Sequence, residues 1–312
     1  MKEYDICVFY AAPYMSGSAY DAFEYYKFLK NKGYKVCAVI STDLPNYKMV
    51  DAILDRYKID IVDLDYDGDL HLISQFHDLK LIRIKCKLLI STSTYSMSQI
   101  ILKPIIIQYD RALMFHETTF DSDYVTKAFN GRLKDKIEMI RDDRCFGVLE
   151  PYNHITYKKK LYFNLFKNID KDKVDNACMI NMATRHKLQS VDAIYKAIKK
   201  FEYKKYIIYT QFTTYHFYRD MASSNIDVII APINNYLYSF NSFIYFQSNR
   251  RQDPSPRIIP ECVFYDKKLE FYEYNKNIKD GAYYRYKDTI EDFDSIVLKD
   301  DDEILDIIND RL

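Results

Sequence analysis

Short apolar runs alternate with amphipathic stretches along the first third of the chain. Residues 4–12 and 35–41 are apolar runs of the kind that forms buried strands. Between them, Ala19 and Phe23 belong to an apolar set with helical spacing, and Gly33 marks the end of that helix. Because a helix that joins two buried strands makes a βαβ unit, this order predicts a parallel sheet with a right-handed crossover.

The same alternation continues through the first half of the sequence. It predicts, in chain order, a helix at Met49–Arg56, strands at Ile59–Leu64, Leu88–Ser91 and Pro104–Tyr109, and a largely helical, charged segment from Tyr124 to Lys160.

A second series of the same kind begins at Ala177. We expect an N-terminal domain at 1–155 and a second domain at 156–295, because Pro151 and a charge-rich run interrupt the pattern. Residues 296–312 form an amphipathic C-terminal helix in this interpretation. Within the second domain the pattern predicts strands at Ala177–Met182, Tyr206–Thr210, Asp227–Ala231 and Leu269–Tyr272, helices at Gln189–Phe201, His216–Ala222 and Arg257–Tyr265, and a loop-rich stretch up to Pro256.

The predicted fold class is therefore α/β, with two Rossmann-like, doubly wound halves that face one cleft. Ligands of such sheets bind at the carboxyl ends of the strands. Polar residues that follow a strand are accordingly the first candidates for a site.

Composition restricts the class of protein further. No run of about 18 apolar residues is present, and the first residues carry charges, so we expect a soluble, cytoplasmic protein without a membrane partner. The 45 basic and 45 acidic side chains cancel, which argues against a nucleic-acid coating protein that binds by bulk positive charge. The six cysteines are far apart and indicate reduced, buried thiols.

Ser16, Gly17 and Ser18 lie between the first strand and the first helix. Free backbone N–H groups and the helix dipole favour an anion or a close backbone approach at such a turn. The alternative is that Ser16 or Ser18 only caps the helix.

Asp110 directly follows the apolar strand predicted at Pro104–Tyr109, and His116 comes shortly after it. A carboxylate at the end of that strand would project into the cleft, where it could abstract a proton. The alternative is a helix cap after the strand.

Arg185, His186 and Lys187 follow the strand at Ala177–Met182. Cations at the carboxyl end of a strand bind phosphates well, Arg in bidentate fashion and Lys as a point charge. The alternative is a solvated cluster of surface charges.

Arg257 and Glu261 lie one helical turn apart, on one face of a helix whose first turn Pro256 and Pro260 favour. A carboxylate there could accept two hydroxyl hydrogen bonds from a ribose. The alternative is a simple ion pair between the two side chains. The acidic stretch from Asp63 to Asp69 could hold a divalent cation, but we favour a solvated loop and predict no metal site.

Taken together, these sites resemble in order and spacing the GT-B glycosyltransferases, and most of all the bacteriophage enzymes that glycosylate hydroxymethylated pyrimidines in DNA. The resemblance rests on YAAPYMSGSAYDAFEYYKFLKNKGYKVCAVISTD, PIIIQYDRA, NMATRHKLQSVDAIYKAIKKF and RIIPECVFYDKKLEF, and covers nearly the whole chain. It implies a GT-B fold with an acceptor-side first domain and a donor-binding second domain.

The resemblance also implies roles for single residues. Asp110 faces the transferred sugar, as the catalytic base if the configuration is inverted or as an orienting group if it is retained. Arg185 and Arg257 neutralise the leaving diphosphate, so that no divalent cation is required. Glu261 holds the ribose of a nucleotide-sugar donor, UDP-glucose or a similar compound. Ser16, Gly17, Ser18 and His116 line the sugar or acceptor side.

Two positions depart from the family pattern. Lys187 follows Arg185 after one residue instead of several, and Asp266 stands where the family has a glycine after the ribose-binding Glu. If duplex DNA with modified bases is the acceptor, a basic strip must hold its phosphates, for which Lys158–Lys160, Lys196–Lys205 and Arg250–Arg251 are candidates.

Two other functions fit the same pattern. One is a cytoplasmic glycosyltransferase that builds a surface polysaccharide or modifies a small metabolite. The other is a non-catalytic module that binds a nucleotide sugar or DNA, since a fold does not fix a function.

Overall fold

The chain divides into two compact units. The computed structural model describes residues 1–13, 15–64, 68–102, 106–116, 137–141, 154–167, 176–183, 188–230, 237, 239–247, 256–273, 283, 286–287 and 293–312. The first unit comprises Met1–Leu54, Ile59–Leu165 and Ile296–Leu312, and the second comprises Asp55–Lys58 and Phe166–Ser295.

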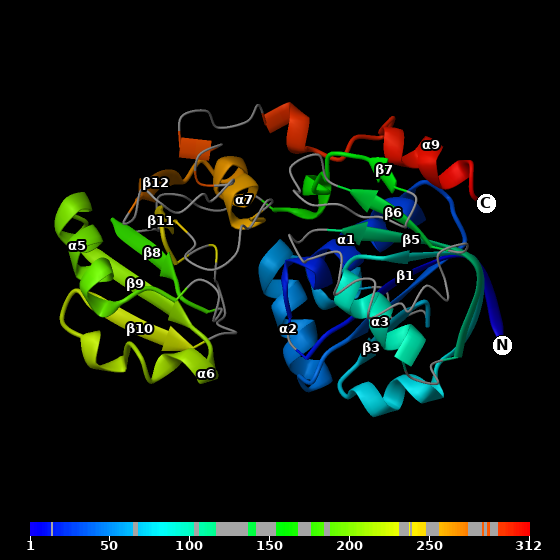
Figure 1. The fold of residues 1–312 in the computed structure, drawn as a ribbon, viewed down its shortest axis with the longest axis horizontal. Helices are drawn as coiled ribbons and strands as arrows, with labels where there is room; N and C mark the ends of the chain where they lie inside the picture. Colours follow the sequence, from blue (N-terminus) through cyan, green and yellow to red (C-terminus); the bar gives the residue numbers. More distant parts are fainter. Residues whose placement is uncertain are drawn as a thin grey trace. The chain divides into compact units, whose positions relative to one another are not determined.

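Within the described residues, the first unit contains a sheet of seven parallel strands in the order β3-β2-β1-β4-β5-β6-β7 (Figure 1). The order in which the chain adds strands reverses between β1 and β4. The carboxyl ends of these two strands are therefore the expected ligand position of this unit. The strands are β1 (Lys2–Ala11), β2 (Val36–Ser41), β3 (Leu70–Ile73), β4 (Arg83–Ser91), β5 (Ile106–His116), β6 (Ile137–Arg141) and β7 (His154–Thr156).

Helices cover this sheet. α1 (Gly17–Asn31) contacts β1 and β2, and it ends where Gly33 adopts a φ of +84°, a conformation that glycine takes without strain. α3 (Thr94–Leu102) inserts Met97 into a core cluster with Cys7 and Phe9 of β1. The other elements are α2 (Asn46–Tyr57) and the 3-10 turns η1 (Ile61–Asp63), η2 (Phe76–Leu81) and η3 (Phe163–Leu165).

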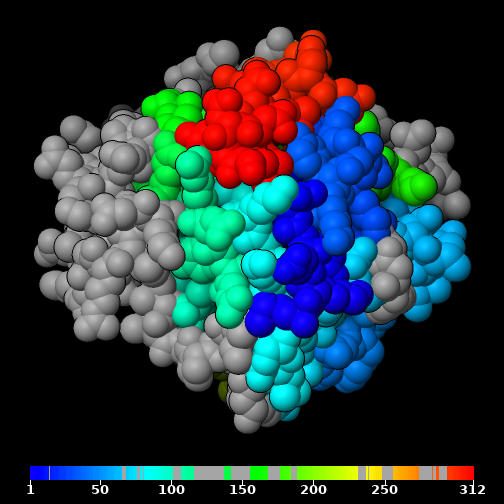
Figure 2. Space-filling view, turned by 90° about the vertical axis from the view of Figure 1, so that its right-hand side faces the viewer, coloured from blue at the N-terminus to red at the C-terminus, as the bar shows by residue number. Residues whose placement is uncertain are grey.

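The C-terminal segment returns to the first unit. Leu161 donates a backbone hydrogen bond to Ile296 (2.9 Å) and accepts one from Leu298 (2.8 Å). Figure 2 shows the segment beside the N-terminal part of the chain on one face of this unit. It contains η7 (Phe293–Ile296) at its start and α9 (Glu303–Asn309), whose first turn is capped by the Asp302 side chain.

The second unit repeats the architecture on a smaller scale. Its described strands form a parallel sheet in the order β10-β9-β8-β11-β12, so its reversal point lies between β8 and β11. The strands are β8 (Ala177–Asn181), β9 (Lys205–Thr210), β10 (Ile226–Ile230), β11 (Ser242–Phe246) and β12 (Lys268–Tyr272), and the helices are α5 (Val191–Phe201), α6 (Phe212–Tyr215), η5 (Arg219–Met221) and α7 (Ile258–Phe264).

The α/β class and the two parallel sheets predicted from the sequence are confirmed, but several local predictions are wrong. Residues 59–64 are not a strand: Asp60 starts the 3-10 turn η1, and Val62 is 85% exposed. The segment 124–160 contains strands β6 and β7 in the part that the structure describes. The loop predicted before Pro256 contains strand β11.

Candidate functional site

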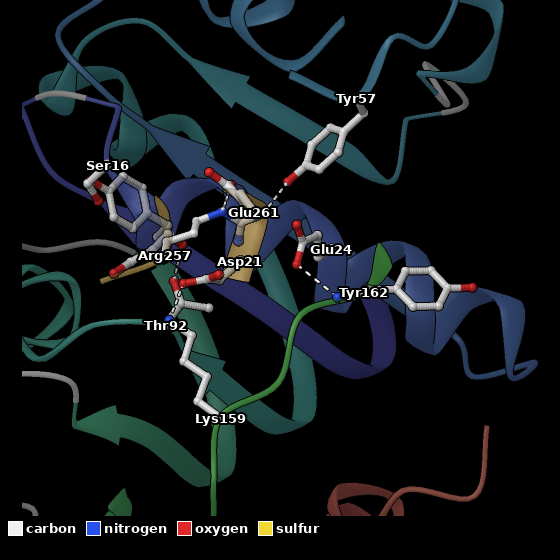
Figure 3. Close-up of polar contacts among 11 residues, drawn as sticks. Ser16, Asp21, Glu24, Tyr57, Thr92, Lys159, Tyr162, Arg257 and Glu261 are labelled. Atoms are coloured by element: carbon white, nitrogen blue, oxygen red, sulfur yellow. Dashed lines mark hydrogen bonds and ion pairs between the residues drawn. The ribbon is translucent and has the colours of Figure 1, made fainter. Parts of the chain in front are cut away.

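The carboxyl edge of the first sheet is lined by hydroxyl groups at the starts of two helices. Ser16 occupies the N-cap position of α1, but its side chain makes no capping hydrogen bond. Its Oγ instead lies 2.9 Å from the hydroxyl of Tyr10, while Thr92 donates to the carbonyl of Ser18 at 2.8 Å (Figure 3). Of the alternatives from the sequence, side-chain capping by Ser16 is therefore wrong.

Sequence reasoning missed the hydroxyl-rich residues at the start of α3. Ser96 Oγ accepts a hydrogen bond from the Ala11 amide (2.9 Å) and lies 2.7 Å from Ser93 Oγ. Within the described residues, the buried hydroxyls of Ser41 and Thr94 have no hydrogen-bond partner. The run STSTYSMS at 91–98 is visible in the sequence, but nothing there shows that it meets β1.

Asp110 does not end its strand. β5 continues to His116, so the carboxylate lies about 20 Å upstream of the carboxyl edge at the usual rise of a strand. Tyr109 pairs with Cys86, which places Asp110 level with Lys87. Asp110 is exposed, and its charge helps to raise the pKa of Lys85, after the larger effect of Glu3. The prediction that Asp110 directly follows its strand is therefore wrong.

His116 is the residue whose backbone ends β5 at the carboxyl edge. It pairs in register with Arg141, the last residue of β6. The position that the sequence interpretation gave to Asp110 is thus taken, on the backbone, by a histidine, a residue type that can exchange protons near neutral pH.

A buried polar network joins α1 to residues 157–162. The Lys159 ammonium is paired with Asp21, whose side chain is only 1% exposed, and Glu24 accepts a hydrogen bond of 3.1 Å from the Tyr162 amide (Figure 3). Lys160 pairs with Asp302 at 2.6 Å. Two of the lysines suggested as a phosphate-binding strip are therefore occupied within the first unit.

In the second unit, Tyr218 fixes the chain just before α5. Its hydroxyl donates to the Gln189 carbonyl (2.8 Å) and accepts from the Gln189 amide (3.1 Å). Burial raises the pKa of Tyr218 to about 12, so the phenol stays protonated and keeps its donor. No local pattern of residues indicates this contact. The predicted phosphate ligands Arg185 and Lys187, with His186, lie outside the described residues.

Arg257 and Glu261 form the ion pair that the sequence offered as an alternative reading of their spacing. Arg257 Nε lies 2.6 Å from Glu261 Oε1, and Glu261 is fully buried at the start of α7 (Figure 3). A second guanidinium, of Arg56, lies 2.9 Å from Oε2. Sequence reasoning missed Arg56, because nothing in the pattern links the end of α2 to α7.

Aromatic rings enclose this cluster. Arg257 Nη2 lies 3.4 Å from the hydroxyl of Tyr57, and its guanidinium lies 6.0 Å from the centre of the Phe166 ring. Tyr57 packs edge-on against the same ring at 5.1 Å. The low dielectric constant of this buried site strengthens the attraction of each guanidinium for the carboxylate and raises the cost of leaving any one of the three charges unpaired.

Asp266 ends α7 in a left-handed conformation, with a φ of +52°. Glycine favours this region, and aspartate is among the residues that tolerate it best. The departure from the family pattern at this position therefore keeps a backbone that a glycine would also adopt.

The described cysteines add no further chemistry to the site. All five described cysteines are buried and free, and burial raises the pKa of Cys178 and Cys262, which keeps these thiols protonated. No group of three His, Cys, Asp or Glu side chains in the described part of the chain could hold a metal ion. Among the same residues, no helix is long and apolar enough to cross a membrane.

Comparisons with known proteins find likeness in structure only. No protein-family model and no curated protein sequence matches the chain. The fold is similar to that of the Anabaena protein HepE in complex with UDP and glucose, with a TM-score of 0.53, 9% identity, and coverage of 94% of this chain and 91% of that one. Also similar are a glycosyltransferase from Rickettsia africae (TM-score 0.46, 11% identity, 92% and 88% covered) and an alpha-glucosyltransferase in complex with UDP (TM-score 0.48, 11% identity, 99% and 90% covered).

Proposed function

We propose that this chain, which has the GT-B fold, is a glycosyltransferase that moves a sugar from a UDP-linked donor to a hydroxyl acceptor. The fold itself follows from the two doubly wound sheets and the likeness to HepE. The observation that carries the proposed activity is the Arg56–Glu261–Arg257 cluster at the start of α7, which follows β11 at the reversal point of the second sheet.

The charges of this cluster suit a nucleotide diphosphate. Two guanidinium groups face a single carboxylate, so these three side chains carry a net positive charge at the edge of the sheet. Arg257, together with Arg185 and Lys187, would neutralise the charge that develops on the leaving diphosphate. Glu261 would accept hydrogen bonds from the ribose hydroxyls. HepE, whose structure holds UDP and glucose, supports a donor of this class.

On the acceptor side, we assign proton transfer to His116 in place of Asp110. His116 ends β5 at the carboxyl edge, where ligands of parallel sheets bind. Asp110 lies in the middle of the same strand. An imidazole within hydrogen-bond reach would take the proton of the acceptor hydroxyl as the new glycosidic bond forms. The hydroxyl-rich starts of α1 and α3, with Ser16, Gly17 and Ser18, would bind the acceptor or the sugar.

The acceptor that we infer is a hydroxymethylated pyrimidine in DNA, and the order of the sequence motifs is its support. Because Lys159 and Lys160 are paired internally, phosphate binding would fall to other cations. Exposed candidates in the second unit are Lys199, Lys200 and Lys204. If the acceptor is instead a polysaccharide precursor or a small metabolite, the donor site stays the same and only the product changes.

The decisive experiment is mass spectrometry of hydroxymethylated duplex DNA, and of a panel of small hydroxyl acceptors, after incubation with the protein and nucleotide sugars. We expect a mass increase of one sugar on the DNA with a UDP-sugar. A product on a small acceptor alone would overturn the DNA assignment and keep the activity. UDP that neither binds nor raises the melting temperature would overturn the donor assignment.

Two variants separate the acceptor-side residues. We expect His116→Ala to lose turnover by about 100-fold or more while UDP still binds, as the removal of a general base does. Asp110→Ala, its matched control on the same strand, should keep both turnover and UDP binding. The reverse result would restore Asp110 to the catalytic role.

A further inference from the structure

The last turn of α2 is part of the second unit. Asp55–Lys58 groups with Phe166–Ser295, although the rest of α2 belongs to the first unit. Lys58 ends the helix in a left-handed conformation, with a φ of +50°. Tyr57 is fully buried, and only 11% of the Arg56 side chain is exposed. A fully solvated helix end would bury neither side chain, so this turn is built into the packing of the second unit.

One contact of Arg56 is with an oxygen of Glu261. Glu261 Oε1 accepts a hydrogen bond from Arg257 Nε at 2.6 Å. Oε2 lies 2.9 Å from Arg56 Nη2, yet within the described residues no hydrogen bond reaches this oxygen, because the contact lacks hydrogen-bond geometry. Oε2 is therefore balanced in charge while its capacity to accept a hydrogen bond remains unused.

A buried polar atom without a hydrogen bond costs free energy, and such atoms in native proteins call for an explanation such as a ligand. A hydroxyl group is the simplest neutral donor that could satisfy a carboxylate oxygen. Arg56 would hold the carboxylate ionised and fixed in orientation, while the buried Oε2 keeps an unused acceptor position for that donor.

We propose that Arg56 is a positioning residue for donor recognition: it orients Glu261 so that Oε2 accepts a hydrogen bond from a ribose hydroxyl. The inference rests on the proposed function, and it adds a residue of α2 to the donor site. Arg56 itself touches no reacting atom. Its contribution is to the choice between ribose and deoxyribose nucleotides.

The test compares UDP with 2′-deoxy-UDP by isothermal titration calorimetry on the full-length protein. The unmodified protein should bind UDP at least about tenfold more tightly, because a hydrogen bond to a charged group contributes that much or more. In Arg56→Met the ratio of the two dissociation constants should approach one. Arg56→Lys keeps the charge and should retain part of the preference.

The matched control is Arg219→Met, which changes an exposed arginine of the same unit, paired only loosely with Asp220 at 3.6 Å. It should leave the UDP to 2′-deoxy-UDP ratio unchanged. A purely structural role of Arg56 would weaken both ligands equally and keep the ratio, and that result would overturn the inference.

Failure of the proposed function gives a different result from failure of this inference. If the unmodified protein binds neither nucleotide, the donor assignment itself fails. If it binds both and Arg56→Met preserves the preference for ribose, only the role of Arg56 fails. If Arg56→Met does not fold, Arg56→Lys provides the test. The inference is contradicted if the ratio of the two dissociation constants in Arg56→Lys equals the ratio in the unmodified protein and in Arg219→Met.

Discussion

The side chain of Tyr218 contacts the chain both before and after the proposed diphosphate ligands Arg185 and Lys187. Its hydroxyl satisfies both backbone groups of Gln189, just before α5, and also lies 3.5 Å from the sulfur of Met182, just after β8. The residues between these two points include Arg185 and Lys187. The phenol therefore connects the two described positions that flank Arg185 and Lys187, the proposed diphosphate ligands.

We predict that Tyr218→Phe lowers the free energy of unfolding by about 1–3 kcal/mol, because the buried amide and carbonyl of Gln189 lose their partner. UDP binding should weaken at the same time, since the contact of Tyr218 with Gln189, close to the proposed diphosphate ligands, is lost. Urea unfolding and calorimetry measure the two effects. Tyr195→Phe, at an exposed tyrosine of α5, is the control and should change neither.

At the scale of single elements, α1 is unusual in burying two carboxylates. Asp21 and Glu24 lie on consecutive turns and are 1% and 2% exposed. Both face residues 157–162, which run from the end of β7 to η3. The helix is thus oriented by charge and hydrogen bonding as well as by its apolar face, and this orientation sets where Ser16, Gly17 and Ser18 lie.

We predict that Asp21→Ala costs about 3–5 kcal/mol of stability, because the buried ammonium of Lys159 loses its carboxylate. The paired replacement Asp21→Leu with Lys159→Met should recover most of this loss, since it removes both charges. Chemical denaturation of the single and the double variant measures the loss and its recovery. Asp192→Ala breaks the exposed pair with Lys196 and should cost less than about 0.5 kcal/mol.

Strands β1, β2, β8 and β9 could be predicted from the sequence because each is an apolar run bounded by turn residues. The ends of strands could not. The charged pair Asp110 and Arg111 interrupts the apolar pattern of β5, but the strand continues through it because its backbone stays paired with β4 as far as Met114, which lies opposite Ser91. Strand β11 was missed because a largely apolar run of five residues between polar neighbours is too short to predict a strand.

The candidate site could be predicted only where its residues are close in sequence. Arg257 and Glu261 are one helical turn apart, and their ion pair follows from that spacing. Arg56, Lys159 and Tyr218 meet their partners through the tertiary fold, so no local pattern reveals them. Asp110 was misplaced because its role depended on a strand end.

At the scale of the whole molecule, the chain crosses between its units more than once. Ile296–Leu312 belongs to the first unit, where Asp302 accepts from Tyr157 at 2.9 Å and Arg311 pairs with Glu138 at 2.6 Å. We predict that a chain ending at Ser295 unfolds its first unit at a lower temperature, because these contacts and the capped helix are lost.

Differential scanning calorimetry with and without UDP checks this prediction. In the shortened chain the first transition should move down, while the transition that UDP stabilises should keep its response to the ligand. Removing only Arg311 and Leu312 is the milder control, since it leaves the Asp302 contacts in place. Equal loss in both transitions would contradict the assignment of this segment to the first unit.

The return of Ile296–Leu312 also orders events during synthesis on the ribosome. Every residue of the second unit is synthesised before the segment that finishes the first unit. Nascent chains usually complete their N-terminal domain first. Here the N-terminal sheet receives its closing helix only after the whole second unit has been synthesised.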